Sequence, residues 1–344
     1  MIILREVKTR SCTLVSVSFI LSGFLFVSCK IKPTDIDHAA PDSMEWEIIS
    51  PNFSGYENCM IEDGTFVDSL QGWCVTHGPE AVWHTVDGGL NWSIQKLFEG
   101  TWLYHVIFVD ALHGWVNGED NGKFESILYR TTDGGESWIR GDTPTYYTIA
   151  IHFVSQSVGF VAHSQIYRTT DGGVSWDTVS VEDIGYFGLF DLHFSDDQNG
   201  WAVGSKSRSG PGVVLSSSDG GENWHIKREE GDCALVVHTD NSIDVCVACL
   251  SPGGPSILIT HDGGDTWDSV SVPETLHGIY LLGDGTGWAT GNSGLLMQTT
   301  DKGNTWSEVD IPVDCSLGSI VFVEEDRVAF IFGKHNRTLL HGRR

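Results

Sequence analysis

Six aspartates in a repeated cassette are the residues of this 344-residue chain that most resemble catalytic groups. Each stands in the pattern Ser/Thr-x-Asp-x-Gly-x-x-Trp, and the six are Asp87, Asp133, Asp171, Asp219, Asp262 and Asp301. Carboxylates can serve as acids, bases or nucleophiles. However, the other cassette residues all suit a tight turn, because Ser, Thr and Asp side chains bond nearby backbone N–H groups and Gly adopts positive φ. We therefore predict a structural role for the six aspartates.

Other candidate reactive groups are less specific. His152 and His193 hold matching positions in successive apolar segments, where they are more simply channel-lining residues than ligands. Cys246-x-x-Cys249 has zinc-like spacing, but no second Cys or His pair accompanies it, so we predict no metal site. Three acidic pairs are interpreted as solvated loop charges: Glu119/Asp120, Glu182/Asp183 and Glu229/Glu230. No nucleotide loop or Ser-His-Asp signature is present, and we predict no cofactor.

A second motif alternates with the Asp cassette and indicates the elements that carry both. Gly-Trp followed by small apolar residues recurs at Gly72-Trp73, Gly114-Trp115, Gly200-Trp201 and Gly287-Trp288. Related segments fill the same slot at Gly159-Phe160, 245–247 and 328–330. Each period of 38 to 48 residues reads as four short strands: an apolar run, the Gly-Trp strand, the strand before the Asp turn and the strand begun by its Trp. Four strands per period is typical of a propeller blade.

The number of blades follows from counting the two motifs. Six Asp turns accompany seven Gly-Trp slots, and the last period, from about Ser316, has three strands and no Asp turn. The segment Glu45–Ile49 resembles the strands that follow Asp turns, so we predict that it pairs with 337–340 and closes the ring. The prediction is an all-β, seven-bladed β-propeller over residues 45–344. Six blades with a ragged terminus is the competing count.

The N-terminal region predicts export. Residues 1–28 have a basic start followed by an apolar stretch that is too short to span a membrane. The segment 25–29, Leu-Phe-Val-Ser-Cys, resembles a lipoprotein lipobox in which Cys29 is acylated, and simple cleavage is the alternative. Residues 29–44 are predicted to be a flexible tether. These features predict a lipid-anchored protein of the periplasm, outer membrane or cell surface.

Charge and cysteine content limit the partners. The net charge of −26 excludes nucleic-acid binding by phosphate neutralisation. Solubility is the simpler explanation of this acidity, and a basic partner is the more specific one. Beyond Cys12 and Cys29, six cysteines could be oxidised in an exported protein, with connectivity open: Cys59, Cys74, Cys233, Cys246, Cys249 and Cys315.

The two motifs together resemble those of the photosystem II stability/assembly factor family. Gly-Trp-Ala-Val-Gly at 200–204 and Thr-Thr-Asp-Gly-Gly at 131–135 carry the resemblance, which covers residues 45–344. It implies a non-enzymatic seven-bladed propeller that binds a membrane-protein precursor. The Asp turn is also the bacterial neuraminidase repeat and occurs in xyloglucan-cleaving glycosidases. This chain has few Arg residues, and it has one propeller where the xyloglucan enzymes have two.

The expected function is therefore an envelope lipoprotein that acts as a protein-binding scaffold or assembly factor and not as an enzyme. A glycan-binding or glycan-cleaving propeller is the alternative. The Asp turns should all lie on one face, so the opposite face is the expected binding surface. Exposed aromatics suit protein or glycan contact. The loops between blades on that face hold Trp102, Tyr104, Tyr146, Tyr147, Tyr186 and Phe187.

Overall fold

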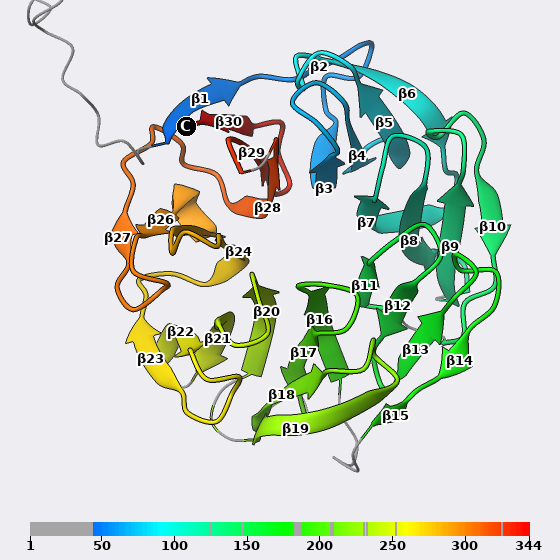
Figure 1. Ribbon diagram of the computed structural model, residues 1–344. Helices are drawn as coiled ribbons and strands as arrows, with labels where there is room; N and C mark the ends of the chain where they lie inside the picture. The colour runs from blue at the N-terminus through cyan, green and yellow to red at the C-terminus, as the bar shows by residue number, and fades with distance from the viewer. Residues whose placement is uncertain are drawn as a thin grey trace, which may run out of the picture. The chain divides into compact units, whose positions relative to one another are not determined.

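Seven antiparallel sheets stand around a central axis in the computed structural model (Figure 1). The structure describes residues 44–123, 125–145, 148–181, 188–206, 210–229, 231, 233–251, 253–324 and 326–344. The segment 44–344 is one compact unit, and the predicted signal and Cys29 lie outside the described residues. Within the described part, the only helical element is a short 3₁₀ turn at Asn292–Gly294, and no helix is long and apolar enough to cross a membrane.

Each blade contains four strands ordered from the axis outward. Blade 1 contains β3 (Met60–Phe66), β4 (Gly72–His77), β5 (Ala81–Thr85) and β6 (Asn91–Leu97). Blade 2 contains β7 (Thr101–Phe108), β8 (Gly114–Asp120), β9 (Glu125–Thr131) and β10 (Ile139–Gly141). Blade 3 contains β11 (Ala150–Phe153), β12 (Gly159–Ala162), β13 (Ile166–Thr169) and β14 (Asp177–Thr178). Blade 4 contains β16 (Gly188–Phe194), β17 (Gly200–Ser205), β18 (Gly212–Ser217) and β19 (Asn223–Glu229). Blade 5 contains β20 (Cys233–Thr239), β21 (Val245–Ser251), β22 (Gly254–Thr260) and β23 (Asp268–Ser271). Blade 6 contains β24 (Leu276–Leu281), β25 (Gly287–Gly291), β26 (Leu296–Thr299) and β27 (Ser307–Glu308).

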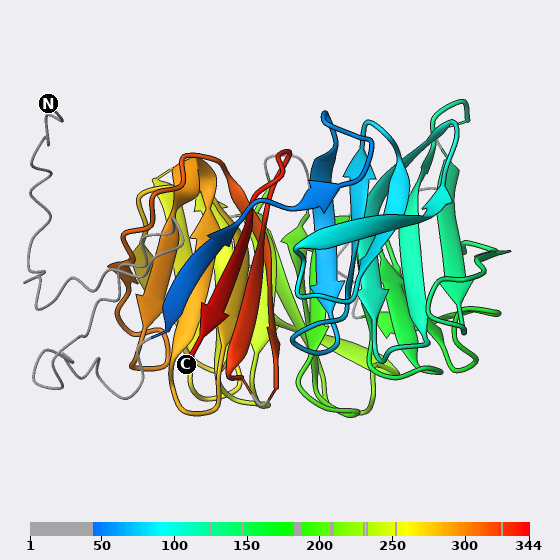
Figure 2. The ribbon, with the colours of Figure 1, turned by 90° about the horizontal axis from the view of Figure 1, so that it is seen from above.

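The seventh blade is shared by the two ends of the propeller. It contains β28 (Leu317–Val323), β29 (Val328–Gly333), β30 (Leu339–Arg343) and, outermost, β1 (Glu45–Ile49). β1 runs antiparallel to β30 from Glu45↔Arg343 to Ile49↔Leu339 (Figure 2). The predicted closure and the count of seven blades are therefore confirmed, and β30 keeps no open edge.

Two additional short strands, which the sequence did not predict, link the outer edges of neighbouring blades. β2 (Asn52–Phe53) follows β1 and pairs in parallel with β6 of blade 1. β15 (Ser180–Val181) follows β14 of blade 3 and pairs in parallel with β19 of blade 4. These strands make two of the sheets five-stranded and carry the chain from one blade onto the next.

The Gly-Trp motif joins neighbouring blades. A Cβ on Gly114 would lie 2.5 Å from the ring of Phe108, which packs over this glycine from the inner strand of the same blade. The Trp115 ring stacks on Phe153 of blade 3, with centroids 3.5 Å apart and an interplanar angle of 8°. Its Nε1–H donates to the carbonyl of Gly172 in the Asp turn of blade 3, at 2.9 Å. Trp73 makes the same stack on Phe108, so Gly114 and Gly159 each admit a Phe that the tryptophan of the preceding blade covers.

Each Asp turn is closed by its own side chains. In the turn of blade 2, Thr131 Oγ1 donates to Asp133 Oδ1 at 2.7 Å and accepts the N–H of Gly135 at 2.9 Å. Asp133 Oδ1 also accepts the N–H of Ser137 at 2.9 Å, and Gly135 has φ of 93°. The other five turns repeat these bonds. The carboxylates are thus engaged in holding the turns.

The cassette Trp begins the fourth strand in only some blades. Trp92 and Trp224 lie within β6 and β19, whereas in the other blades the strand begins one residue after the Trp. Three cassette indoles donate to the second glycine of their own turn, as Trp92 does to the carbonyl of Gly89 at 2.8 Å. The expectation that the Trp always starts the strand is therefore only partly correct.

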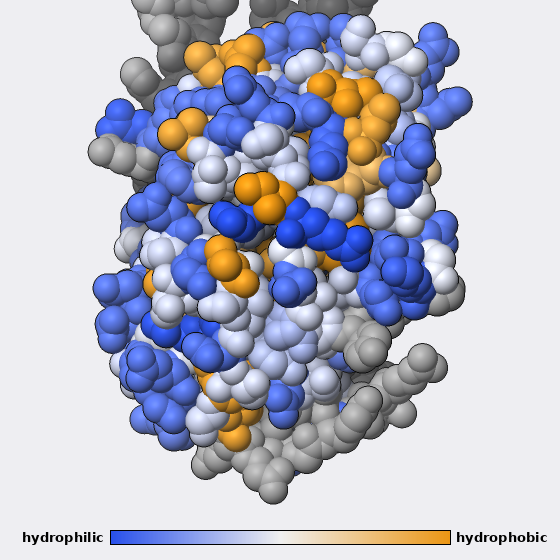
Figure 3. Space-filling model, turned by 90° about the vertical axis from the view of Figure 1, so that its right-hand side faces the viewer, coloured by the Kyte–Doolittle hydropathy of each residue, from blue (hydrophilic) through white to orange (hydrophobic). Residues whose placement is uncertain are grey.

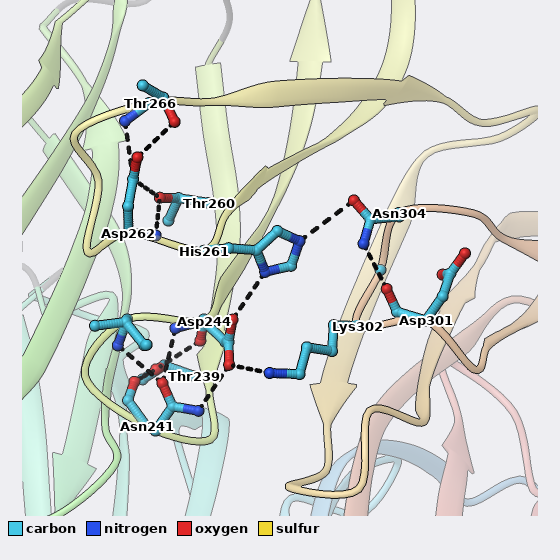
Figure 4. Close-up of polar contacts among 12 residues, drawn as sticks. Thr239, Asn241, Asp244, Thr260, His261, Asp262, Thr266, Asp301, Lys302 and Asn304 are labelled. Atoms are coloured by element: carbon cyan, nitrogen blue, oxygen red, sulfur yellow. Dashed lines mark hydrogen bonds and ion pairs between the residues drawn. The ribbon is translucent and has the colours of Figure 1, made fainter.

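A polar network replaces the tryptophan between blades 5 and 6 (Figure 4). Blade 5 has Cys246 in the Gly-Trp slot, so it has no indole N–H for the next Asp turn. That turn carries Lys302, at φ 61°, where the other turns have a glycine. Lys302 Nζ lies 3.0 Å from Asp244 Oδ2, while His261 contacts Asp244 at 2.8 Å and Asn304 at 3.3 Å. The ion pair and hydrogen bonds connect the two blades.

Removing an Asp-turn carboxylate should destabilise the propeller in a pH-dependent way. Hydrogen bonds from the Asn223 side chain and from backbone N–H groups hold the pKa of Asp219 at about 2. We expect Asp219→Ala to lower the free energy of unfolding by about 1 kcal/mol, as loss of a capping side chain does. The difference from wild type should be constant above about pH 4, the unfolded pKa, and vanish as pH falls through about 2. Urea unfolding at pH 7 and pH 2.5 measures it; an equal difference at both pH values would contradict the role of the charge.

The side of the propeller that carries blades 2 and 3 is predominantly hydrophilic (Figure 3). Figure 3 shows blue and white surface interrupted by separate apolar side chains. Exposed apolar residues such as Leu70, Leu112 and Val174 lie in the turns of the Asp-turn face.

Candidate functional site

A cavity of about 530 Å³ occupies the axis of the ring. Residues of all seven innermost strands line it: β3, β7, β11, β16, β20, β24 and β28. Each innermost strand starts at the face that carries the loops between blades and ends at the face of the Asp turns, because successive strands of a blade are antiparallel. The channel is therefore the place where residues from every blade converge, as ligand sites in concave, multi-element positions do.

β-bulges shape the mouth of the channel on the face away from the Asp turns. Near its start, each of six inner strands shifts register against its neighbour, so that one or two of its residues form a bulge. Bulges re-aim side chains and are frequent at barrel rims and functional sites. The bulge residues are Glu62, Tyr104, Phe190, Leu235, His277, Gly318 and Ser319.

Two carboxylates lie just inside this mouth, one residue after a bulge. Asp63 Oδ2 accepts the N–H of Val106 at 3.2 Å and lies 3.3 Å from Nδ1 of His105. Asp191 accepts the N–H groups of Leu192 and Val237, both at 2.9 Å. Burial raises the pKa of Asp191 to about 6, so this carboxylate is largely ionised at neutral pH. Both bonds to Val106 and Val237 cross from one blade to the next.

Deeper in the channel, three histidines and a tyrosine form a ladder along blades 3 to 6. The ring centroids are 5.2 Å apart for His152–His193, 4.2 Å for His193–His238 and 3.9 Å for His238–Tyr280. Burial lowers the pKa of His152 to about 4 and that of His238 to about 3. The ladder is therefore uncharged at neutral pH. His152 and His193 do neighbour each other at the channel, in the matching positions that the sequence indicated.

The structure places the predicted aromatic residues as follows. Trp102 and Tyr104 lie in β7, not in a loop between blades: Trp102 is 38% exposed, and Tyr104 is the bulge residue. The reason is that the innermost strand of blade 2 extends further toward the mouth than its apolar run indicates. Four of the predicted aromatics lie outside the described residues: Tyr146, Tyr147, Tyr186 and Phe187.

Glu119 corrects one expectation about the acidic pairs. It was expected to be a solvated loop charge, but it lies in β8, is only 4% exposed and accepts the hydroxyl of Tyr104 at 3.0 Å. Its position opposite Trp102 in the β7–β8 pairing buries it against the extended inner strand. Asp120, its neighbour, lies at the end of β8.

Asp63, Asp191 and His238 were not predicted from the sequence. A signal was present for the last, because His238, like His152 and His193, is the inner-strand residue opposite the Gly-Trp slot. The same register places Tyr280 opposite Trp288. The two aspartates follow bulges, which a single sequence does not reveal.

The cysteines form no metal site in the described part of the chain. Cys246 and Cys249 are both buried in β21, and residues three apart on a strand point to opposite faces. Among the described residues, no group of three or more His, Cys, Asp or Glu side chains could hold a metal ion. Cys59, Cys74, Cys246 and Cys315 are free thiols.

These features define the class of protein as a seven-bladed β-propeller with Asp-turn repeats around a lined channel. A family model described as "Photosynthesis system II assembly factor YCF48" matches residues 187–282. The photosystem II assembly lipoprotein Ycf48 of Synechococcus sp. (strain CC9902) is 25% identical over 240 residues, which is 67% of this chain and 64% of that protein. The chain therefore resembles the assembly factor Ycf48, and it spans about two thirds of that relative's length.

Solved structures support the same fold. A structure of YCF48 bound to a D1 peptide covers 87% of this chain and 97% of its own, with 22% identity and a TM-score of 0.66. A GH74 xyloglucanase from Xanthomonas campestris covers 85% of this chain and 53% of its own, with 12% identity and a TM-score of 0.60. At these identities the likeness concerns the fold alone.

Proposed function

We propose that this chain is a lipid-anchored envelope protein that holds a protein partner on the face away from its Asp turns, without catalysing a reaction. The observation that carries the proposal is the channel mouth, where bulges from six blades turn side chains toward one opening. The resemblance to Ycf48 supports it, since that relative is described as an assembly lipoprotein. The lipobox-like segment ending at Cys29 supports the anchor and a location in the periplasm, outer membrane or cell surface.

The two faces of the propeller differ in what they offer a partner. On the Asp-turn face, the six aspartates are bonded within their turns. The mouth face offers Trp102, which is 38% exposed, and Met60, which is 42% exposed at the start of β3. Large apolar and aromatic side chains beside a concave opening are the composition of protein-binding hot spots.

Photo-cross-linking in intact cells tests the proposal. p-Benzoylphenylalanine at Met60 should cross-link the chain to a defined envelope protein. The same group at Val174, which is 54% exposed in an Asp turn, is the matched control and should give no such product. A cross-link of equal yield from both positions, or from Val174 alone, would contradict the assignment of the face. Saturable retention on a polysaccharide array would support the glycan-binding alternative instead.

Fractionation of the same cells tests whether Cys29 carries a lipid anchor. The wild-type chain should sediment with membranes, and Cys29→Ser should move it to the soluble fraction. If both forms are soluble, the acylation of Cys29 is wrong, while the choice of binding face still depends on the cross-links.

A further inference from the structure

Two carboxylates in the channel have acceptor capacity that their contacts with the described residues do not fill. Both contacts of Asp63 involve its Oδ2, and its Oδ1 has no partner among the described residues. Each oxygen of Asp191 accepts a single backbone N–H. An ionised carboxylate has about four lone-pair sites, so both groups can accept further bonds from a donor in the channel. A donor-only group such as an ammonium or guanidinium meets that requirement.

A fixed donor lies deeper in the same channel. The backbone N–H of Leu281 donates to Nδ1 of His238 at 3.1 Å. Because a backbone N–H can only donate, Nδ1 is the acceptor and the proton of the neutral ring is on Nε2. His238 is 6% exposed and lines the cavity, and its Nε2–H has no hydrogen-bond partner among the described residues. An occupant that brings a carbonyl oxygen would satisfy it.

The remaining walls suit an aliphatic chain between the two polar ends. The cavity is also lined by Val106, Ile151, Val237, Ile279 and Ile320, and by the ring of Tyr280. The imidazoles of the ladder are uncharged at neutral pH, so they do not repel a cation. Lys and Arg side chains combine an apolar stem with a charged end, so the stem fits the apolar wall and the charged end fits the carboxylates.

We propose that the channel receives an extended segment of the partner protein, in which one lysine or arginine side chain points back toward the mouth, with its cationic end at Asp63 and Asp191 and a nearby backbone carbonyl at the deeper His238. This inference rests on the proposed function, because it describes how the same face recognises its partner protein. The net charge of the chain, −26, favours the approach of such a segment. A free amine, such as a polyamine, would satisfy the carboxylates but not His238.

The inference is tested with defined peptides and no knowledge of the partner. The probe is acetyl-Gly-Gly-Arg-Gly-Gly-amide, and the matched peptide has citrulline, the uncharged analogue of arginine. Titration followed by ¹H–¹⁵N NMR should give saturable shifts in β3, β16 and β20, with a Kd of about 1 mM or tighter for the arginine peptide. The citrulline peptide should bind at least about tenfold more weakly, because charged hydrogen bonds are lost. Equal affinities for the two peptides, or no saturable shift with arginine, would overturn the inference.

Paired variants place the effect in the channel. Asp63→Asn with Asp191→Asn keeps an acceptor oxygen for each backbone N–H and should weaken the arginine peptide by at least about tenfold. The control is Asp177→Asn with Asp268→Asn, which changes net charge equally on exposed outer strands and should leave affinity unchanged. If both pairs of substitutions weaken the affinity for the arginine peptide equally, the binding is due to general charge attraction and the proposed channel site is wrong. If the channel pair fails to fold, the comparison of arginine, citrulline and spermine on the wild-type protein decides: spermine binding with shifts equal to those of the arginine peptide overturns the inference.

The outcomes for the two proposals are separable. If the variant with Asp63→Asn and Asp191→Asn still cross-links to the same partner through position 60, the scaffold function stands, and the channel does not recognise the partner. Channel binding of the arginine peptide without any cross-linked protein would support the pocket and reject the scaffold.

Discussion

Deleting β1 is expected to open the propeller and lower its thermal midpoint by about 10 °C or more. A chain that begins at Pro51 loses the five residues that pair with β30, from Glu45↔Arg343 to Ile49↔Leu339. Each lost backbone hydrogen bond contributes about 1 kcal/mol, and a total near 5 kcal/mol corresponds to roughly 10 °C in a domain of this size. The uncovered edge of β30 also becomes a template for aggregation. Calorimetry and light scattering measure the two effects.

A chain that begins at Met44 is the matched control and should melt like the full-length protein. A synthetic peptide of residues 44–50, added to the shortened chain, should raise the midpoint with the logarithm of its concentration above the Kd, because binding to the folded state alone stabilises it. An unchanged midpoint in the shortened chain would show that β1 does not contribute to closure.

Trp115→Ala should lower the free energy of unfolding by about 3–5 kcal/mol, the range for an aromatic side chain removed from a core. Trp115 is 2% exposed, stacks on Phe153 and donates to the carbonyl of Gly172. The substitution therefore removes contacts between blades 2 and 3 and leaves a cavity that the rigid sheets cannot fill. Urea unfolding followed by far-UV circular dichroism measures the loss.

Trp115→Phe distinguishes the stack from the hydrogen bond. Blade 3 already uses Phe160 in this slot, where it stacks on Phe194 with centroids 4.5 Å apart. We expect the Phe variant to lose only about 1–2 kcal/mol, because packing is largely kept and one hydrogen bond is removed. If Phe and Ala cost the same, the indole hydrogen bond outweighs the stack.

Much of the fold could be predicted because its signals are local and repeated. In the cassette around Asp133, the Thr, Asp and Gly residues bond to one another within five positions, so the turn forms wherever the cassette occurs. Gly114 and Trp115 mark the second strand, because the glycine admits Phe108 and the indole reaches the next blade. Once each period reads as four strands, the three-stranded last period requires a partner, and Glu45–Ile49 was the available strand.

The candidate site was harder to predict because it depends on how neighbouring strands pair. The bulges that precede Asp63 and Asp191 are shifts in pairing between two strands, and alternation along one strand does not show them. Glu119 is buried because β7 extends opposite it, which its own charged segment does not indicate. His238 was within reach, since the matching positions of His152 and His193 set a register that also contains it.

The sequence by itself determined the architecture: seven blades, the positions of the Asp turns and the strand that closes the ring. These follow from hydrogen bonds and packing between residues close in the chain, repeated until the number of strands required a circle. Only the tertiary structure decided which side chains meet on the axis. Asp63 and Asp191 come from blades 1 and 4 and His238 from blade 5, so they share one cavity only because closure brings the innermost strands together.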